Sequence, residues 1–278
     1  MNKSHRPIII VAPNGARKTK EDLPQIPLWP DELAKEAKAC VEKGASMFHL
    51  HIRNKEQGHT LDVDTYKRTI EAIRETCGDK MIVQATSESC GIYQPEQQMK
   101  MVKELKPEAV SMALREFIPR PDYEFEGGEF FAWVKENKIF AQYILYSPEE
   151  LQYFAELADQ RIIPEGDNFV LFVLGKKQRV STADNYALPG DLDPFLKKLK
   201  STGLNLQWAI CAFGGNENAC VEYAVENGGH ARIGFENNHL FIDQSIAPSN
   251  ASLVEQFVET SGVKPLSADE VRGLFKLK

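Results

Sequence analysis

The sequence lacks the features of a membrane protein and of a nucleic-acid-binding protein. No stretch of about 18 consecutive apolar residues occurs, so no membrane-spanning helix is expected. Residues 1–6 are polar and hold no apolar signal-peptide core, which indicates a cytoplasmic protein without a membrane partner. The net charge of −7 argues against nucleic acid as a partner, because phosphate binding requires a basic surface.

Cysteine is scarce, and two common enzyme motifs are missing. The five cysteines are odd in number, scattered and without a CxxC pair, so we expect reduced thiols instead of a disulfide framework. The first apolar segment leads into Pro13-Asn14-Gly15-Ala16 and not into the GxGxxG turn of dinucleotide-binding sheets. No GxSxG segment is present, and no Ser/His/Asp nucleophile arrangement is evident.

What the sequence does contain is a regular alternation of short apolar segments and amphipathic helices. Parallel, buried strands are predicted at 7–12, 46–52, 81–85, 109–112, 139–145, 169–174, 206–210 and 231–234. Helices are predicted at 31–42, 64–76, 96–105, 130–136, 148–157, 192–199, 218–226, 250–259 and 268–274. Asp31 and the pair Ser249-Asn250 stand in N-cap positions. Eight such units predict a single (β/α)8 TIM-barrel domain over 1–278, in preference to an open doubly wound sheet.

Two histidines stand two residues apart at the end of the second predicted strand. Because side chains alternate along a strand, His49 and His51 project to the same side. Barrel enzymes place their active sites at this end of the strands, and two imidazoles on one face suit a metal ion. A hydrogen-bonded histidine pair that fills the barrel is the alternative, and the motif alone leaves both open.

A second polar segment, 230–238, runs off the end of the eighth predicted strand and places Glu236 at the same mouth. A His/His/Glu set leaves one coordination position open for water or substrate, as catalytic zinc sites do. The combination of His49, His51 and Glu236 therefore favours a divalent metal, and zinc is expected, although imidazole also suits manganese or nickel. Arg232 on the same strand suits either a carboxylate substrate or an ion pair that braces the barrel.

Other polar groups lie near the same mouth. Glu21 belongs to the long polar loop 14–24 and could reach the centre as an acid or base. The hydroxyl groups of Thr86, Ser87 and Ser111 suit hydrogen bonds to a substrate carboxylate or keto oxygen. The basic run 176–179 could meet the phosphates of coenzyme A, although a solvated loop is the interpretation that the sequence alone favours.

Together these segments resemble the β-keto acid cleavage enzyme family, over nearly the whole chain. The resemblance is carried by Ala12-Pro13-Asn14-Gly15-Ala16, by Thr19-Lys20-Glu21 with prolines 24, 27 and 30, and by the segments 48–53, 172–175, 228–238 and 249–255. Each motif is weak by itself, but their order and spacing are specific.

The resemblance implies a TIM barrel that holds zinc through the two histidines and the glutamate. It implies homo-oligomers, often tetramers, and acetyl-CoA as co-substrate: a β-keto acid and acetyl-CoA yield acetoacetate and a new acyl-CoA. Arg232 matches a family arginine that would assist an acid/base partner or hold the carboxylate. Glu21 matches the acidic residue of the first loop, and Thr86 and Ser111 resemble substrate-binding positions.

Four positions depart from the family pattern. The catalytic position after the glutamate, where the family has an aspartate base, is Asn237 here, and an amide does not accept a proton as a carboxylate does. Asn54 replaces a second acid, and Gln142 and Ile144 stand where acidic residues are common. We therefore expect a divergent substrate without a cationic group, and either another base such as Glu21 or a different reaction.

Two further functions are kept beside the acyltransferase. One is a metal-dependent C–C lyase or hydrolase that acts on a keto acid without coenzyme A, which the loss of the aspartate makes credible. The other is a metal-containing barrel that only binds a small acid. If the amide is the relevant change, Asn237→Asp is expected to raise the cleavage of ordinary family substrates.

Overall fold

Eight parallel strands close into a barrel in the computed structural model, which describes residues 5–166, 168–175 and 186–277. The barrel strands are β1 (Ile9–Val11), β2 (Met47–Leu50), β5 (Ile82–Thr86), β6 (Ala109–Ala113), β7 (Phe140–Leu145), β8 (Phe169–Leu174), β9 (Gln207–Ala212) and β10 (His230–Ile233). Around the barrel they follow the order β1-β10-β9-β8-β7-β6-β5-β2. Each predicted strand overlaps one of these, so the predicted (β/α)8 fold is confirmed.

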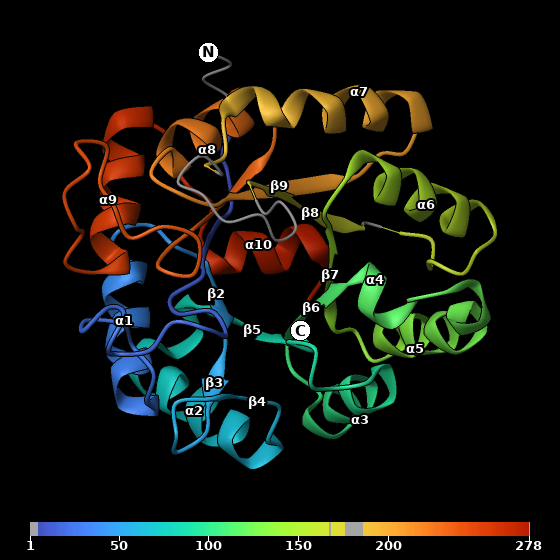
Figure 1. Cartoon of the computed structure of the whole chain (residues 1–278), viewed down its shortest axis with the longest axis horizontal. Helices are drawn as coiled ribbons and strands as arrows, with labels where there is room; N and C mark the ends of the chain where they lie inside the picture. The colour runs from blue at the N-terminus through green and yellow to red at the C-terminus, as the bar shows by residue number, and fades with distance from the viewer. Residues whose placement is uncertain (1–4, 167, 176–185, 278) are drawn as a thin grey trace.

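The helices, α10 apart, surround the barrel on its outer side (Figure 1). They are α1 (Pro30–Glu42), α2 (Val63–Cys77), α3 (Pro95–Leu105), α4 (Leu114–Phe117), α5 (Glu124–Glu136), α6 (Pro148–Asp159), α7 (Asp193–Thr202), α8 (Glu217–Glu226), α9 (Asn250–Ser261) and α10 (Ala268–Phe275). Short 3₁₀ helices lie at Gly78–Lys80, Pro121–Tyr123 and Pro189–Leu192. No helix of the described residues is long and apolar enough to cross a membrane.

Three local features differ from the sequence prediction. An antiparallel hairpin, β3 (Ile52–Arg53) and β4 (His59–Thr60), follows the second barrel strand, and α4 follows the fourth; neither was expected. The α5 helix also begins before the predicted 130–136, because Gly127 and Gly128 hide its helical pattern in the sequence. Gly127 is required there, since a Cβ atom would lie 2.7 Å from Cγ1 of Ile118.

The predicted helix caps are only partly right. Ser249 caps α9, because its Oγ accepts a hydrogen bond from the N–H of Ser252 at 3.1 Å. The α1 helix begins at Pro30, with Trp29 in the N-cap position, so Asp31 lies inside the first turn and not at the cap. The carboxylate of Glu32 accepts from the N–H groups of Leu28 and Trp29 instead.

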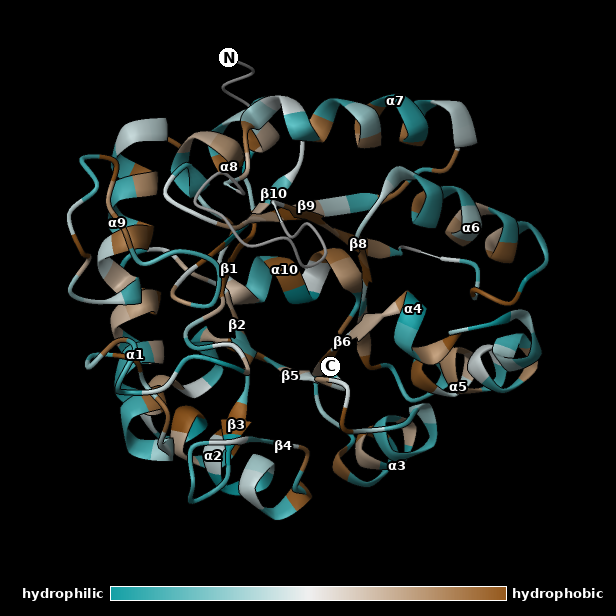
Figure 2. Ribbon diagram, in the orientation of Figure 1, coloured by the Kyte–Doolittle hydropathy of each residue, from teal (hydrophilic) through white to brown (hydrophobic). Residues whose placement is uncertain are grey.

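The apolar side chains of the barrel strands form two layers, one between the barrel and the helices and one inside the barrel. On β2, Phe48 and Leu50 belong to the layer between the barrel and the helices, whereas Met47 belongs to the inner layer. Figure 2 shows hydrophobic residues along the strands and hydrophilic ones on the outer sides of the helices. Because side chains alternate along a strand, His49 must point inward with Met47.

The α10 helix closes the N-terminal end of the barrel, and in Figure 1 it lies across the barrel centre. Ala268 and Val271 pack into the inner apolar layer, and the ring of Phe275 lies 4.5 Å from that of Phe140. Arg272 pairs at 2.6 Å with Glu108, directly before β6. The opposite end, where the strands finish, is left for the polar residues predicted from the sequence.

Candidate metal centre and active site

The two predicted histidines converge at the C-terminal end of β2. Both side chains are buried, and their Nε2 atoms lie 3.1 Å apart. The strand alternation predicted this common direction. The separation by itself fits either a hydrogen bond or a shared metal ion, so the third group decides between the two interpretations.

Glu236 supplies that third group, from the turn that follows β10. Its Oε2 atom lies 3.5 Å from Nε2 of His49 and 3.4 Å from Nε2 of His51. Among the described residues, His49, His51 and Glu236 form the set of His, Cys, Asp or Glu side chains that could hold a metal ion. Only β1 separates β2 from β10 in the barrel, which brings the two strand ends close together.

The spacing of the three ligand atoms fits a tetrahedral metal ion. With metal–ligand bonds of about 2.0–2.1 Å, two ligands of a tetrahedral zinc are about 3.4 Å apart. The observed separations of 3.1, 3.4 and 3.5 Å lie around this value. The Oε2 atom of Glu236 is buried and, within the described part of the chain, receives no hydrogen bond, as expected of a ligand atom.

Neighbouring side chains give His49 and Glu236 the protonation states that a metal ligand needs. Burial and the positive charge of Arg232 lower the pKa of His49 to about 3, so the imidazole is neutral at pH 7. Nδ1 of His49 is 2.8 Å from Oε1 of Gln84, which fixes the proton on Nδ1 and leaves the Nε2 lone pair free. Burial opposes ionisation of Glu236, but Arg232 and both histidines hold its pKa well below the usual range.

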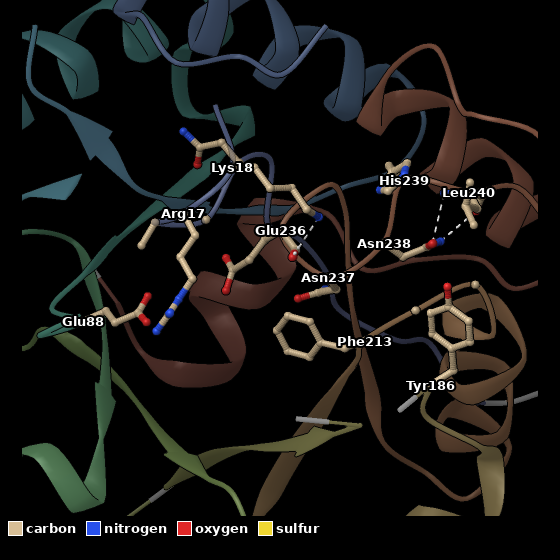
Figure 3. A pocket seen from close by; sticks show the side chains of 15 residues that line it. Arg17, Lys18, Glu88, Tyr186, Phe213, Glu236, Asn237, Asn238, His239 and Leu240 are labelled. Carbon is tan, nitrogen blue, oxygen red and sulfur yellow. Dashed lines mark hydrogen bonds between the residues drawn. The ribbon is translucent and has the colours of Figure 1, made fainter. Parts of the chain in front are cut away.

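Backbone contacts fix the turn that carries Glu236. Gly15 packs against it so closely that a Cβ atom would lie 2.5 Å from Cγ of Glu236, and the φ of Gly15 is +62°. The ammonium group of Lys18 donates to the carbonyl oxygen of Phe235, and Figure 3 shows Lys18 reaching this turn. Arg53 in turn donates to the carbonyl oxygens of Gly15 and Lys18, which ties the first loop to the β3–β4 hairpin.

Arg232 braces the glutamate and faces a cavity. Its Nη2 atom donates to Oε1 of Glu236 at 2.8 Å and to Oδ1 of Asn237 at 2.9 Å. The guanidinium is almost completely buried and lines a narrow inner cavity. Both roles that the sequence left open, the bracing ion pair and the contact with a substrate carboxylate, are therefore compatible with its position.

Asn237 makes hydrogen bonds with three groups through its amide. Besides accepting from Arg232, it donates through Nδ2 to the main-chain carbonyl of Arg232 and to Oε1 of Glu217, both at 3.1 Å. Glu217 was not predicted, because a carboxylate in the first turn of a helix usually faces solvent. Here it is buried against the turn after β10, and burial raises its pKa to about 8.

Two cavities with shared lining residues border the candidate metal site, through Glu236 in both and His49 in the inner one. The outer one, of about 490 Å³, is bounded by the segments 14–18, 213–215 and 236–240 with Glu88 and Tyr186. The inner one, of about 20 Å³, shares Glu88, Phe213 and Glu236 with it and reaches the barrel interior. Figure 3 shows Arg17 extended toward Glu88 across the outer cavity.

The predicted hydroxyl groups differ in their access to these cavities. Thr86 and Ser111 line the inner cavity, and the Oγ atom of Ser111 has no hydrogen-bond partner among the described residues. Ser87 is buried and lines neither cavity, because its Oγ donates to the carbonyl oxygen of Ser111 at 2.6 Å. Thr86 and Ser111 are therefore placed to meet a ligand, whereas Ser87 joins β5 to β6.

Two acidic side chains near the mouth differ in their access to the cavities. Glu21 is exposed, and it lines neither cavity. Glu88, which was missed, lines both cavities, and its Oε2 atom is 3.9 Å from Nε2 of His51. Its position two residues after Thr86 at a strand end was the signal that could have identified it.

The inner cavity is apolar where β7 borders it. Ile144 lines it together with Ala113 and Val173. Gln142 is buried in the barrel, and both polar atoms of its amide are without a partner within the described residues. The predicted basic run at 176–179 lies outside the described residues.

The chain is similar to proteins of one enzyme family. The sequence profile of the beta-keto acid cleavage enzymes matches residues 6–277. The chain is 30% identical to the 3-keto-5-aminohexanoate cleavage enzyme of Fusobacterium nucleatum, over 98% of each chain. It is 26% identical to the 3-oxoadipate:acetyl-CoA acetyltransferase of Cupriavidus necator, over 90% of this chain and 86% of that protein. The apo structure of ObcA superposes with a TM-score of 0.72 at 16% identity, over 91% of this chain and 66% of that one, which supports the fold alone.

Proposed function

The chain belongs to the beta-keto acid cleavage enzyme family, and we propose that it is a zinc-dependent acyltransferase. In the proposed reaction, a β-keto acid and acetyl-CoA give acetoacetate and a new acyl-CoA. A bond forms between C2 of the keto acid and the acetyl carbonyl carbon, and the coenzyme A thiolate leaves. That thiolate then attacks C3, the C2–C3 bond breaks, and C2 regains the proton that was removed before the first bond formed, so that atoms and charges balance.

The zinc assignment is supported by the convergence of two imidazole nitrogens and one carboxylate oxygen at tetrahedral spacing. His49, His51 and Glu236 would hold the ion. A zinc ion bound there supplies a Lewis acid beside the inner cavity, which polarises a keto oxygen and stabilises developing negative charge.

The residues around the triad account for binding and proton transfer. Arg232 lines the inner cavity and suits the substrate carboxylate, while its Nη2 atom holds Glu236 in place. We assign the removal of the C2 proton to Oε2 of Glu88, because Glu88 borders both cavities and Asn237 has no proton-accepting carboxylate. Glu21 belongs to the same proposal as an alternative base, but its exposed position favours Glu88.

The uncharged wall at Ile144 supports a substrate whose variable end carries no positive charge. No carboxylate of β7 faces the inner cavity, since the strand contributes Ile144 to its lining. An ammonium group at this position would lie against Ile144, Ala113 and Val173, and burying a charge against apolar side chains is costly. The proposal therefore separates this chain from the relative named for an amino-substituted keto acid.

A substrate panel tests this function. The zinc-loaded protein is incubated with β-keto acids that share a chain length and differ in a neutral, anionic or cationic end, with and without acetyl-CoA. We expect acetoacetate and the matching acyl-CoA, fastest with the uncharged substrate and only with acetyl-CoA. Turnover without acetyl-CoA would instead support the lyase or hydrolase, and the cationic substrate being fastest would contradict the assigned specificity.

The remaining expectations stay predictions. They are a single domain, a homo-oligomer, for which the resemblance implies a tetramer in many cases, and a cytoplasmic location. Light scattering on the purified protein measures the oligomeric state, and a mass of one chain in solution would contradict it.

A further inference from the structure

The first residue of α8, Glu217, is a buried carboxyl group with no role in the reaction described above. Its Oε1 atom accepts hydrogen bonds from the N–H of Gly234 at 3.2 Å and from Nδ2 of Asn237 at 3.1 Å. The side chain is only 2% exposed and lines neither cavity. Burying a carboxyl group costs free energy unless the group is hydrogen-bonded. We therefore ask what its hydrogen bonds to the turn after β10 achieve.

The hydrogen bonds around Asn237 allow only one orientation of its amide. Arg232 has only donors, so Oδ1 of Asn237 must face it. Glu217 accepts at Oε1, so Nδ2 must face Glu217. The acceptor on α8 therefore fixes which end of the amide meets the guanidinium.

The two residues of this pair occupy different sides of the cavity wall. Asn237 lines the outer cavity, whereas Glu217 lies behind it. An aspartate at position 237 would place its carboxylate on the wall and beside Arg232. With Asn237 there, Glu236 is the carboxylate that pairs with Arg232 among the described residues.

We propose that Glu217 is a positioning residue that keeps the carboxyl group of this turn behind Asn237, orients the Asn237 amide, and so leaves the charge of Arg232 available to an anionic substrate. The geometric part, one carboxyl and one amide shared between positions 217 and 237, stands without reference to any reaction. The effect on substrate binding rests on the proposed function.

The pairing changes what Asn237→Asp is expected to do. The aspartate would bring a second carboxyl group to within hydrogen-bond distance of Glu217 and would lose the Nδ2 donor that Oε1 now binds, and a buried acceptor without its donor destabilises the fold. The single substitution is therefore expected to be harmful, in contrast to the gain predicted from the sequence. Exchanging both groups, as in Glu217→Gln with Asn237→Asp, restores one carboxyl and one amide.

Five zinc-loaded proteins test the proposal: the natural chain, Glu217→Gln, Glu217→Ala, Asn237→Asp and the double variant. We expect Asn237→Asp to lower Tm by about 3 °C or more, and the double variant to regain most of that loss. Glu217→Gln keeps the acceptor for Asn237 and is expected to keep Tm, whereas Glu217→Ala loses the acceptor and is expected to lower Tm. Additive changes in Tm would overturn the pairing.

The substrate-binding part has its own readout. In the double variant a carboxylate stands on the wall of the outer cavity, so KM for the keto acid is expected to rise about fivefold or more while kcat changes little. An unchanged KM would overturn this part. If no protein of the set turns over any keto acid, the proposed function fails, and the Tm cycle still decides the pairing.

Discussion

The Oε2 atom of Glu236 lies 3.4 Å from Nε2 of His51, and no donor among the described residues satisfies it with a hydrogen bond. A buried carboxylate oxygen without a partner costs free energy, and a cation at this point removes the cost. The same arrangement that suggests a catalytic metal therefore also couples metal binding to the stability of the barrel.

The hydrogen bond between Gln84 and His49 is expected to set the affinity for the metal. Gln84→Leu removes the oxygen that fixes the Nδ1 proton of His49 and should weaken zinc binding about 10–100-fold. Gln142→Leu is the matched control, since Gln142 is also buried in the barrel but makes no hydrogen bond within the described residues. Competition with a chromophoric chelator measures both affinities; equal losses in the two variants would refute the role of Gln84.

Substitution of Glu88 and of Glu21 distinguishes between the two candidate bases. Glu88→Gln keeps the shape of the side chain but removes proton acceptance, so kcat should fall about 10²–10⁴-fold. Glu21→Gln should leave kcat within about threefold, because Glu21 is exposed and outside both cavities. Steady-state kinetics with zinc-loaded proteins provide the comparison, and the reverse order of effects would return the base to the first loop.

The buried Glu217 predicts a specific dependence of stability on pH. Its pKa is raised from 4.5 to about 8, chiefly by burial, so the folded state holds a proton that the unfolded state releases above about pH 4.5. Its contribution to stability is complete below that pH and is lost as the pH rises toward 8. Chemical denaturation between pH 5 and 8.5 should show that Glu217→Gln declines less with pH than the natural chain; parallel curves would show that Glu217 is ionised in the fold.

Much of the fold and of the candidate metal site could be predicted from the sequence because both follow from local rules. The alternation along β2 determined the common direction of His49 and His51, and the end of β10 located Glu236 at the same mouth. Glu88 and Glu217 could not be placed in this way. Their burial depends on how a loop and a helix start pack against neighbouring strands, and the sequence pattern does not encode these contacts locally.

Other differences between the sequence prediction and the structure have similar physical reasons. The β3–β4 hairpin has strands of two residues, too short to give a periodic signal. Glu21 was favoured because a long polar loop at the catalytic end often carries function. In the structure, this loop also contacts the Glu236 turn, through the close approach of Gly15 and the hydrogen bond that the ammonium group of Lys18 donates to the carbonyl oxygen of Phe235.

The metal content of the purified protein tests the central claim most directly. Elemental analysis of the natural chain after reconstitution and desalting should give about one zinc per chain, as a single His/His/Glu site requires. His49→Ala and Glu236→Ala should each hold far less than one, while remaining folded by circular dichroism. Full zinc content in both variants would contradict the assigned site.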